Sequence, residues 1–472
     1  MKAFKIIFIN LFLIIIAIPL VGLLWYEEPE VTENKVLASQ PEIIVDNKLN
    51  LKFFADLESY FSDHFAYRQE LVTTNAIIKS YVFAESSEDL AIVGKDGWLY
   101  LRVSLEDYQG TNVASSRGLN NMAKTLSLMQ EYVESLGAKF VFSCAPNKNT
   151  LYPEYMPYYY RVYDKYSNLD LLTTKMNSYN VNYVDLQGMF EKEEEILYHK
   201  GDSHWNNKGA AMVQDAILDK INVDHIDFSD LEYTTYDTFE GDIDKILYPL
   251  DRHTEVEYDY SQYFAYEYIT PMTDTPIVEQ PIVETTNNNP SRGNLLCFRD
   301  SFGNSLLPFM ANEFNYSCFS KNVPYRLDDV YNKSINVCVI ELVERNLIQL
   351  IKMAPIMPAP LRNFNEECEE YHSDSTTLEI SSYDCYYKLM GEVDKKYVSD
   401  SSPIYIRLSS DSGVYVVEAF PTDDDYQGSN VSDYGYTAYL NKSSLPSGEF
   451  TIEIITENGV YYKMVCKDTI KF

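Results

Sequence analysis

The stretch GNLLCFRDSFGNSLLPFMANEF, residues 293–314, decides the fold. Its first part, GNLLCF, is a short apolar run typical of a buried strand, and NSLLPFMANEF is typical of a helix. Arg299–Gly303 forms the turn between them, so Ser301 lies where a strand ends and a helix begins. A nucleophilic serine needs this setting, because its hydroxyl is exposed there and the first amides of the helix face the developing oxyanion. The pattern therefore predicts Ser301 as a nucleophile.

Short apolar strands alternate with helices on both sides of this stretch. Apolar residues recur at intervals of three and four from Leu119 to Leu136, which predicts an amphipathic helix that Gly137 stops. The other segments are strands in KFVFSCAP (139–146), VNYVDL (181–186) and INVCVIEL (335–342), and a helix in NNKGAAMVQDAILDKI (206–221). This alternation predicts a mostly parallel sheet covered by helices on both faces, an α/β sandwich over residues 89–370.

The remaining segments differ in composition. Residues 27–88 are expected to form a stalk with short helices, and AIVGKDGWLYL (91–101) predicts two strands around an Asp-Gly turn. Residues 253–292 are rich in Tyr and Pro and weakly periodic, which predicts an insertion or long surface loop near the site. Residues 371–472 contain several β-rich runs with a turn at Glu457–Gly459, which predicts a C-terminal β-sandwich domain.

A base for Ser301 is predicted in GDSHW, residues 201–205. No apolar strand leads into Ser203, so Ser203 is not expected to be a nucleophile. The side chains of Asp202 and His204 can approach each other, which predicts His204 as the general base and Asp202 as the group that orients its ring. The alternative is that Asp202 caps the helix beginning near Asn206 while His204 and Trp205 only pack. The other five histidines are expected at the surface, with His199 as a second candidate for the base.

The oxyanion site is predicted at the backbone amides of Ser301, Phe302 and Gly303. Asn147 follows the strand KFVFSCAP, so its side chain is a further candidate donor at the carboxyl edge of the sheet. The alternative is that Asn147 is a turn residue.

Three more side chains are expected to line the cleft, namely Lys148, Trp205 and Arg345. For Arg345 the alternative is a structural ion pair with Glu341 or Glu344.

Composition restricts the function classes. The chain has 38 basic and 71 acidic residues and a net charge of −33, so a nucleic-acid partner is not expected. The seven cysteines have no CxxC spacing, and no metal site or cofactor is predicted. Cys385 and Cys466 are the one pair that could form a disulfide. The acidic stretch TDDDYQG (422–428) is expected to be solvated.

Residues 1–26 are predicted to form a transmembrane helix. Lys2 and Lys5 precede an apolar run of about 20 residues, the length that crosses a bilayer, and EEPE follows it. The positive-inside tendency then places the rest of the chain outside the cytoplasm, at the cell membrane. A cleaved signal peptide is the alternative, but its apolar region is normally shorter and ends in an Ala-x-Ala-like site.

Five motifs in order resemble the alginate O-acetylation proteins of the AlgX and AlgJ type, also called DHHW proteins. These are GKDGWLYL (94–101), APNKNTLYPEYMP (145–157), GDSHWNNKGA (201–210), FRDSFGNSLLP (298–308) and ELVERNL (341–347). Ser203 stands where the family name has its first histidine.

The resemblance implies an SGNH-hydrolase-like domain in which Asp202 and His204 precede Ser301. It implies an O-acetyltransferase that acts through an acetyl-serine on an extracytoplasmic polysaccharide, with a multi-pass membrane-bound O-acyltransferase as partner. Two alternatives stay open. The same triad would serve an esterase that removes acetyl groups. The other alternative is a non-catalytic scaffold protein that binds polysaccharide.

Overall fold

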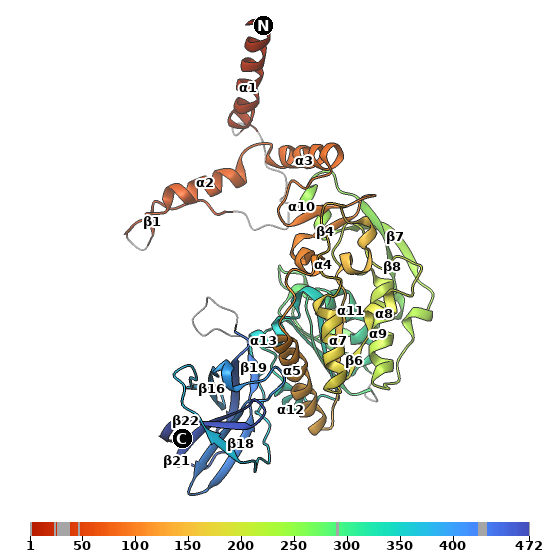
Figure 1. Cartoon of the computed structure of the whole chain (residues 1–472). Coiled ribbons are helices and arrows are strands. Elements are labelled where there is room, and N and C mark those ends of the chain that lie inside the picture. The colour runs from red at the N-terminus through yellow and green to blue at the C-terminus, as the bar shows by residue number, and fades with distance from the viewer. Residues whose placement is uncertain are drawn as a thin grey trace.

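The computed structural model describes residues 2–22, 25, 38–45, 48–288, 292–422 and 432–471 (Figure 1). Its body is an α/β domain joined to an all-β domain near the C-terminal end of the chain.

The centre of the α/β domain is a seven-stranded sheet in the order β6-β5-β13-β11-β12-β10-β9. The strands are β5 (Lys139–Ala145), β6 (Tyr183–Val184), β9 (Glu267–Tyr268), β10 (Ile282–Thr286), β11 (Asn294–Phe298), β12 (Tyr316–Ser320) and β13 (Val337–Val343). From β6 to β12 neighbouring strands are parallel, while β10 and β9 run antiparallel at one edge. The mostly parallel sheet expected from the sequence is confirmed.

Helices cover both faces of this sheet. The helices of the α/β domain are α4 (Leu105–Gln109), α5 (Ser116–Ser135), α6 (Lys148–Leu151), α7 (Asn168–Ser178), α8 (Leu186–Phe190), α9 (Asn207–Lys220), α10 (Asp242–Leu247), α11 (Gly303–Glu313), α12 (Asp329–Asn332) and α13 (Gln349–Lys352). Successive strand residues point to opposite faces. Phe140 and Phe142 accordingly pack with α5 and α7, whereas Val141 packs with α9 and α11. Two apolar cores hold β5, β11 and β13 between the helix layers.

Residues 253–292 do not form the surface loop that their composition suggested. The segment contains β8 (Thr254–Asp259), which pairs with β7 (Thr234–Glu240), and it ends in β10. β10 hydrogen-bonds to β12 along its full length, and Val283 and Thr285 are buried. The sequence missed this edge because its buried positions alternate with polar residues instead of forming an apolar run.

The C-terminal residues form two β-sheets, as the β-rich runs indicated. One has the order β14-β22-β21-β17-β18 and the other β15-β16-β20-β19. The strands are β14 (Cys368–Glu370), β15 (Glu379–Tyr383), β16 (Tyr386–Glu392), β17 (Tyr405–Ser410), β18 (Gly413–Glu418), β19 (Phe420–Thr422), β20 (Gly435–Asn441), β21 (Glu449–Glu457) and β22 (Tyr461–Lys471). Buried residues of both sheets belong to the same core as α5 and α7, so the two domains share one apolar interior.

The expected disulfide is absent. Cys385 and Cys466 are both free thiols; Cys385 lies in the turn between β15 and β16 of one sheet, whereas Cys466 lies in β22 of the other. The acidic stretch 422–428 lies, apart from Thr422, outside the described residues.

The N-terminal part contains α1 (Lys2–Gly22), β1 (Ile44–Val45), β2 (Lys48–Leu49), α2 (Phe53–His64), α3 (Arg68–Ile78) and the single-turn π-helix η1 (Lys79–Phe83). In Figure 1 α1 and α2 lie outside the body of the molecule. Among the described residues no helix is both long enough and apolar enough to cross a membrane, so the transmembrane helix predicted at residues 1–26 is not found. The expected hairpin is present in β3 (Ala91–Val93) and β4 (Leu99–Leu101), with Asp96 and Gly97 at positive φ in its turn.

Candidate active site

Ser301, His204 and Asp202 lie in one chain of hydrogen bonds. Ser301 follows β11 and immediately precedes α11, and its Oγ lies 2.8 Å from His204 Nε2. On the other side of the ring, His204 Nδ1 lies 2.6 Å from Asp202 Oδ1. Because Asp202 can only accept when ionised, Nδ1 carries a proton and a neutral ring presents Nε2 to the serine as an acceptor.

The Asp-x-His segment is held by the backbone around it. Tyr198 and Trp205 form an isolated antiparallel bridge, so the residues between them turn back on themselves. Asp202 Oδ1 also accepts the backbone N–H of His204 at 2.9 Å. The N-cap of α9 is Asn206, whose side chain accepts from Gly209 N, and not Asp202 as the alternative interpretation held.

Lys148 does not line a cleft; its buried side chain hydrogen-bonds to the backbone of this segment. Its Nζ donates to the backbone carbonyls of His199 at 3.0 Å, Lys200 at 2.8 Å and Asp202 at 2.5 Å. Burial lowers the pKa of the Lys148 ammonium to about 8, against the raising effect of the carboxylates of Asp202, Asp242 and Glu255. The sequence placed Lys148 in the cleft because only the fold reveals that its side chain is buried.

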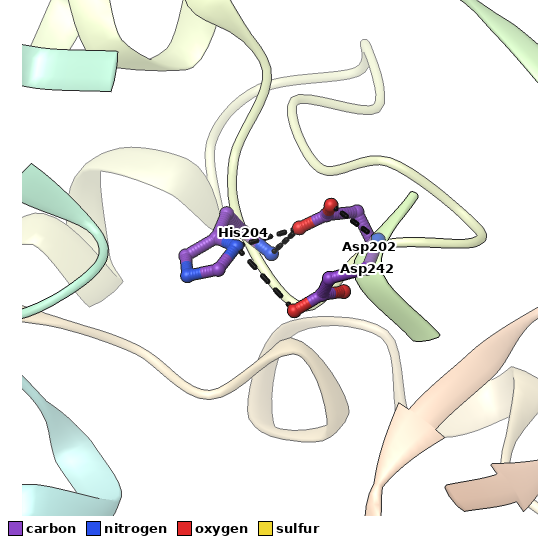
Figure 2. Close-up of side chains that lie close together, drawn as sticks. All are labelled: Asp202, His204 and Asp242. Atoms are coloured by element: carbon purple, nitrogen blue, oxygen red, sulfur yellow. Dashed lines mark hydrogen bonds and ion pairs between the residues drawn. The ribbon is translucent and has the colours of Figure 1, made fainter. Parts of the chain in front are cut away.

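Asp242 is a fourth polar residue of the site, and no sequence motif points to it. Its backbone N–H donates to Asp202 Oδ2 at 2.8 Å, and its carboxylate accepts from Ser203 N at 2.8 Å and Ser203 Oγ at 2.7 Å. Its Oδ2 lies 3.8 Å from His204 Nδ1, and Figure 2 shows both carboxylates on the same side of the imidazole. Asp242 begins α10, 40 positions after Asp202, so no local pattern links the two residues.

These charges shift the pKa values of the group. Burial opposes the ionisation of Asp202. The positive charge of His204 and the hydrogen bonds that Asp202 accepts from His204 and Asp242 outweigh burial, so the pKa of Asp202 is lowered. Burial also opposes the imidazolium form of His204, yet Asp202 and Asp242 raise the pKa of His204 above its usual 6.5. Burial and the negative charge of Asp202 raise the pKa of Asp242.

The turn that carries Ser301 is fastened by Asp300. Asp300 Oδ1 accepts the N–H of Phe302 at 3.0 Å, and Oδ2 accepts the N–H of Val343 at 2.8 Å and the Asn346 amide at 2.9 Å. The sequence predicted the amides of Phe302 and Gly303 as oxyanion donors. In the structure the Phe302 amide donates to Asp300 Oδ1 instead, and the role of the Gly303 amide stays a prediction. Within the described part of the chain, the Ser301 N–H makes no hydrogen bond and remains available.

Asn147, Arg345 and Trp205 surround the turn. Asn147 is buried; its Nδ2 donates to Asp107 Oδ2 at 3.0 Å, and its Oδ1 accepts from Arg345 Nη1 at 3.3 Å. The Arg345 guanidinium lies 5.5 Å over the Phe302 ring, and the carboxylates of Glu341 and Glu344 bond elsewhere. Trp205 is 1% exposed and its Nε1 donates to Ser305 Oγ at 2.8 Å, so it packs under the site and does not line it.

A cavity of about 430 Å³ borders this arrangement. Arg345 and Asp107 lie in its wall together with Ser115 and Asn168, and Asp433 closes it from the C-terminal domain. The cavity shares Arg345 with the surroundings of Phe302, and its lining is rich in hydrogen-bonding groups.

Two other histidines are buried, contrary to their expected surface positions. His199 is 3% exposed; its Nε2 lies 3.0 Å from Glu257 Oε2 and its ring stacks on Phe239. It therefore joins the β7–β8 hairpin to the body and does not approach Ser301 as the second candidate base. The His225 side chain is 5% exposed and lies in a separate cluster.

Comparison with known proteins gives the class. Residues 91–275 match the family model described as the SGNH hydrolase-like domain of the acetyltransferase AlgX. The matched segment includes Asp202, His204 and Asp242 and ends before Ser301. The resemblance to the alginate O-acetylation family, inferred from the five motifs, is thereby confirmed over residues 91–275, which are similar to the SGNH hydrolase-like domain of that family.

Several solved structures are similar to the chain. A DHHW family protein from Eubacterium siraeum is 20% identical, with 55% of this chain and 95% of that chain covered and a TM-score of 0.41. PatB1 from Bacillus cereus is 17% identical, with coverage of 55% and 97% and a TM-score of 0.45. AlgX from Pseudomonas aeruginosa is 12% identical, with coverage of 74% and 86% and a TM-score of 0.35. No curated protein sequence matches the chain.

Proposed function

We propose that this protein is a polysaccharide O-acetyltransferase that works through an acetyl-serine at Ser301. The observation that carries the proposal is the continuous hydrogen-bond chain from Asp202 through His204 to Ser301, with separations of 2.6 Å and 2.8 Å. It supplies a nucleophile, a base and a group that fixes the tautomer of the base.

In the first step Ser301 Oγ attacks the carbonyl carbon of an acetyl ester or thioester donor while His204 Nε2 takes the hydroxyl proton. The Ser301 N–H is placed to donate to the oxyanion, and the Arg345 guanidinium adds positive charge nearby. When the tetrahedral species collapses, the bond to the donor breaks and His204 returns its proton to the leaving atom. Asp202 stays ionised throughout and stabilises the imidazolium.

In the second step a sugar hydroxyl attacks the acetyl-serine. His204 Nε2 accepts the hydroxyl proton, the new ester forms on the sugar oxygen, and Ser301 Oγ leaves as it regains that proton. Two ester exchanges replace one direct transfer, and no cofactor is needed.

The acceptor class is supported by the cavity beside Arg345. Its wall contains the carboxylates of Asp107 and Asp433, which already accept hydrogen bonds from protein groups but keep further lone pairs for sugar hydroxyls. Apolar side chains such as Met122 and Ile348 form the rest of the wall and can face the apolar side of a sugar ring. The family resemblance adds that the acceptor is an extracytoplasmic polysaccharide.

The location and the acetyl source are parts of the proposal that rest on sequence. The resemblance to proteins that acetylate an extracytoplasmic polysaccharide supports a location at the cell membrane, with the catalytic domain outside the cytoplasm. A multi-pass membrane-bound O-acyltransferase would then bring acetyl groups across the membrane. Cell fractionation and protease accessibility of the α/β domain in intact cells test the location, and co-purification tests the partner.

The chemistry is tested by incubating the purified full-length protein with an activated aryl acetate and measuring its intact mass. One added acetyl group is expected on the parent and none on Ser301→Ala. His204→Ala should acetylate at least about a hundredfold more slowly, since a general base contributes roughly 10²–10⁴ in rate. Ser203→Ala is the matched control and should still be acetylated, because Ser203 faces Asp242 and not the nucleophile's position.

Adding a soluble oligosaccharide then separates the alternatives. Acetyl groups recovered on the sugar support the transferase, whereas acetate released at the same rate with and without sugar supports an esterase. Failure of the parent to form any adduct or turn over the ester would contradict both and leave the binding scaffold.

A further inference from the structure

A second cluster of metal-ligand types lies apart from the active site, where the chain leaves α9. It consists of Asp215 on α9, His225, and Asp227 just before the 3-10 helix η4 (Phe228–Asp230). One ligand atom of each residue lies within 4.8 Å of those of the other two. His225 Nε2 is 3.3 Å from Asp227 Oδ1 and 3.9 Å from Asp215 Oδ1.

The ring of His225 is fixed in one tautomer. Its Nδ1 lies 2.8 Å from the backbone carbonyl of Val223, and because a carbonyl only accepts, Nδ1 carries the proton. In the neutral ring, Nε2 then carries an unprotonated lone pair. The side chain is 5% exposed, and Nε2 makes no hydrogen bond in the described part of the chain although Asp227 Oδ1 is 3.3 Å away.

The carboxylates are equally prearranged. Asp215 is mostly buried, and its two oxygens accept the backbone N–H groups of Phe228 at 3.0 Å and Ser229 at 2.9 Å. Each oxygen keeps a second lone pair. The intervening loop is also pinned by Ile226 N, which donates to Glu313 Oε2 at 3.3 Å. Hydrogen bonds of this kind orient the ligands of metal sites.

A buried lone pair facing two carboxylates needs a positive charge between them. Nε2 lies 3.3 Å from Asp227 Oδ1 and 3.9 Å from Asp215 Oδ1 without forming a hydrogen bond to either. A divalent cation between the three atoms would offset the charges of both carboxylates. Ligand bonds of about 2.0–2.2 Å around Zn²⁺ separate neighbouring ligand atoms by roughly 3–4 Å. The two separations from His225 Nε2, 3.3 Å and 3.9 Å, lie in this range, and all three ligand atoms lie within 4.8 Å of one another.

We propose that Asp215 Oδ1, His225 Nε2 and Asp227 Oδ1 bind one divalent transition-metal ion, Zn²⁺, with water completing the tetrahedron. No metal site was predicted from the sequence, because these three residues occur in no recognised spacing. Asp227 is 65% exposed, so the ion can enter from solvent. The site ties the middle of α9 to the chain segment that leads to β7, and it contributes stability without touching Ser301.

The test uses the full-length protein without a polyhistidine tag, stripped of metal with a chelator. Because Asp202, His204 and Asp242 form a cluster of similar composition, the measurement is made in the His204→Ala background. One Zn²⁺ per chain is expected after desalting, together with a rise in Tm.

The decisive variant is Asp227→Asn, which alters an exposed side chain and should not disturb folding. It should raise the Kd for Zn²⁺ at least tenfold and abolish the rise in Tm, as should His225→Gln. Asp230→Asn, an exposed acidic neighbour, is the control and should bind like the parent.

Two results would overturn the proposal. One is the absence of stoichiometric Zn²⁺ in the His204→Ala protein. The other is a rise in Tm that is unchanged in Asp227→Asn.

Discussion

The imidazole of His204 faces two carboxylates, and each has a separate task. Asp202 accepts the hydrogen bond of His204 Nδ1–H and is itself fixed by the backbone N–H of Asp242. The Asp242 carboxylate does not hydrogen-bond to the ring but holds Ser203 through both its N–H and its hydroxyl. Ser203, which stands where the family name has histidine, thereby links the Asp-x-His segment to α10.

The charge of Asp242 should be visible in the pH dependence of activity. Since base catalysis needs the neutral imidazole, the acidic limb of kcat/KM should have its midpoint above pH 6.5, in the direction in which the pKa of His204 is raised. Asp242→Asn removes a charge that stabilises the imidazolium, so the limb should move to lower pH, by on the order of one unit.

Asp237→Asn on the exposed part of β7 is the control for this measurement and should leave the profile unchanged. If the acidic limb does not move in Asp242→Asn, the Asp242 carboxylate does not affect the pKa of His204.

The residues found from sequence share one property: a local signal marks them. Ser301 stands between an apolar strand and a helix, and Asp202 and His204 are two positions apart. Asp242, Asp300 and Arg345 act through contacts between distant segments. Of these three, only Arg345 was predicted as a site residue. Sequence periodicity does not reveal a hydrogen bond between residues 40 or more positions apart.

Among the elements, the loop between Tyr198 and Trp205 depends on one buried lysine. Lys148, at the start of α6, donates to three carbonyls of this loop, and no other cation is described at these acceptors. The loop is therefore positioned by a side chain from the carboxyl end of β5.

Lys148→Met should disorder the loop and reduce kcat. The carbonyls of His199 and Asp202 would be left unpaired at about 1–3 kcal/mol each, whereas the Lys200 carbonyl keeps the N–H of Leu99. A shift of about 1 Å in a catalytic group costs roughly a hundredfold in rate. We expect kcat for an aryl acetate to fall by about that factor with a smaller change in KM. Lys200→Met, an exposed lysine of the same loop, should behave like the parent. Equal losses in the two variants would contradict a positioning role for Lys148.

The elements predicted correctly are those with an uninterrupted apolar or amphipathic pattern, such as α5, β5 and β13. The antiparallel edge was missed. β10 and β12 contain Glu284, Thr285, Ser317 and Ser320 among their apolar residues, so they lack the apolar run of a central strand. The positions of β10 and β12 in the sheet are determined by their backbone hydrogen bonds to each other, which cannot be predicted from composition.

At the level of the whole molecule, α5 joins the two domains. Its inner side packs on the sheet, and the same core continues into the β-sheets of the C-terminal domain. Polar contacts reinforce the junction: Arg117 donates to the carbonyls of Asp433 at 2.8 Å and Ser399 at 2.6 Å, and Arg362 bonds to both Glu131 and Glu418.

Arg117→Ala should destabilise both domains together. The buried guanidinium and its two hydrogen bonds would be lost, although the carbonyls of Asp433 and Ser399 keep Asn121 and Ser402 as donors, at a cost of about 2 kcal/mol in the free energy of unfolding. Denaturant unfolding should show one transition shifted to lower concentration, with Glu134→Ala on the exposed side of α5 as the unaffected control. Two separate transitions in the parent would show that the domains unfold independently.

The common interior beneath α5 limits how this chain can be divided or recombined. A truncation before residue 371 would uncover the apolar outer side of α5 to water, and the shortened product should aggregate. Grafting a foreign C-terminal module would demand a matching surface for that helix. A change of apolar residues in the C-terminal sheets should therefore need a compensating change in α5 to keep the shared interior filled.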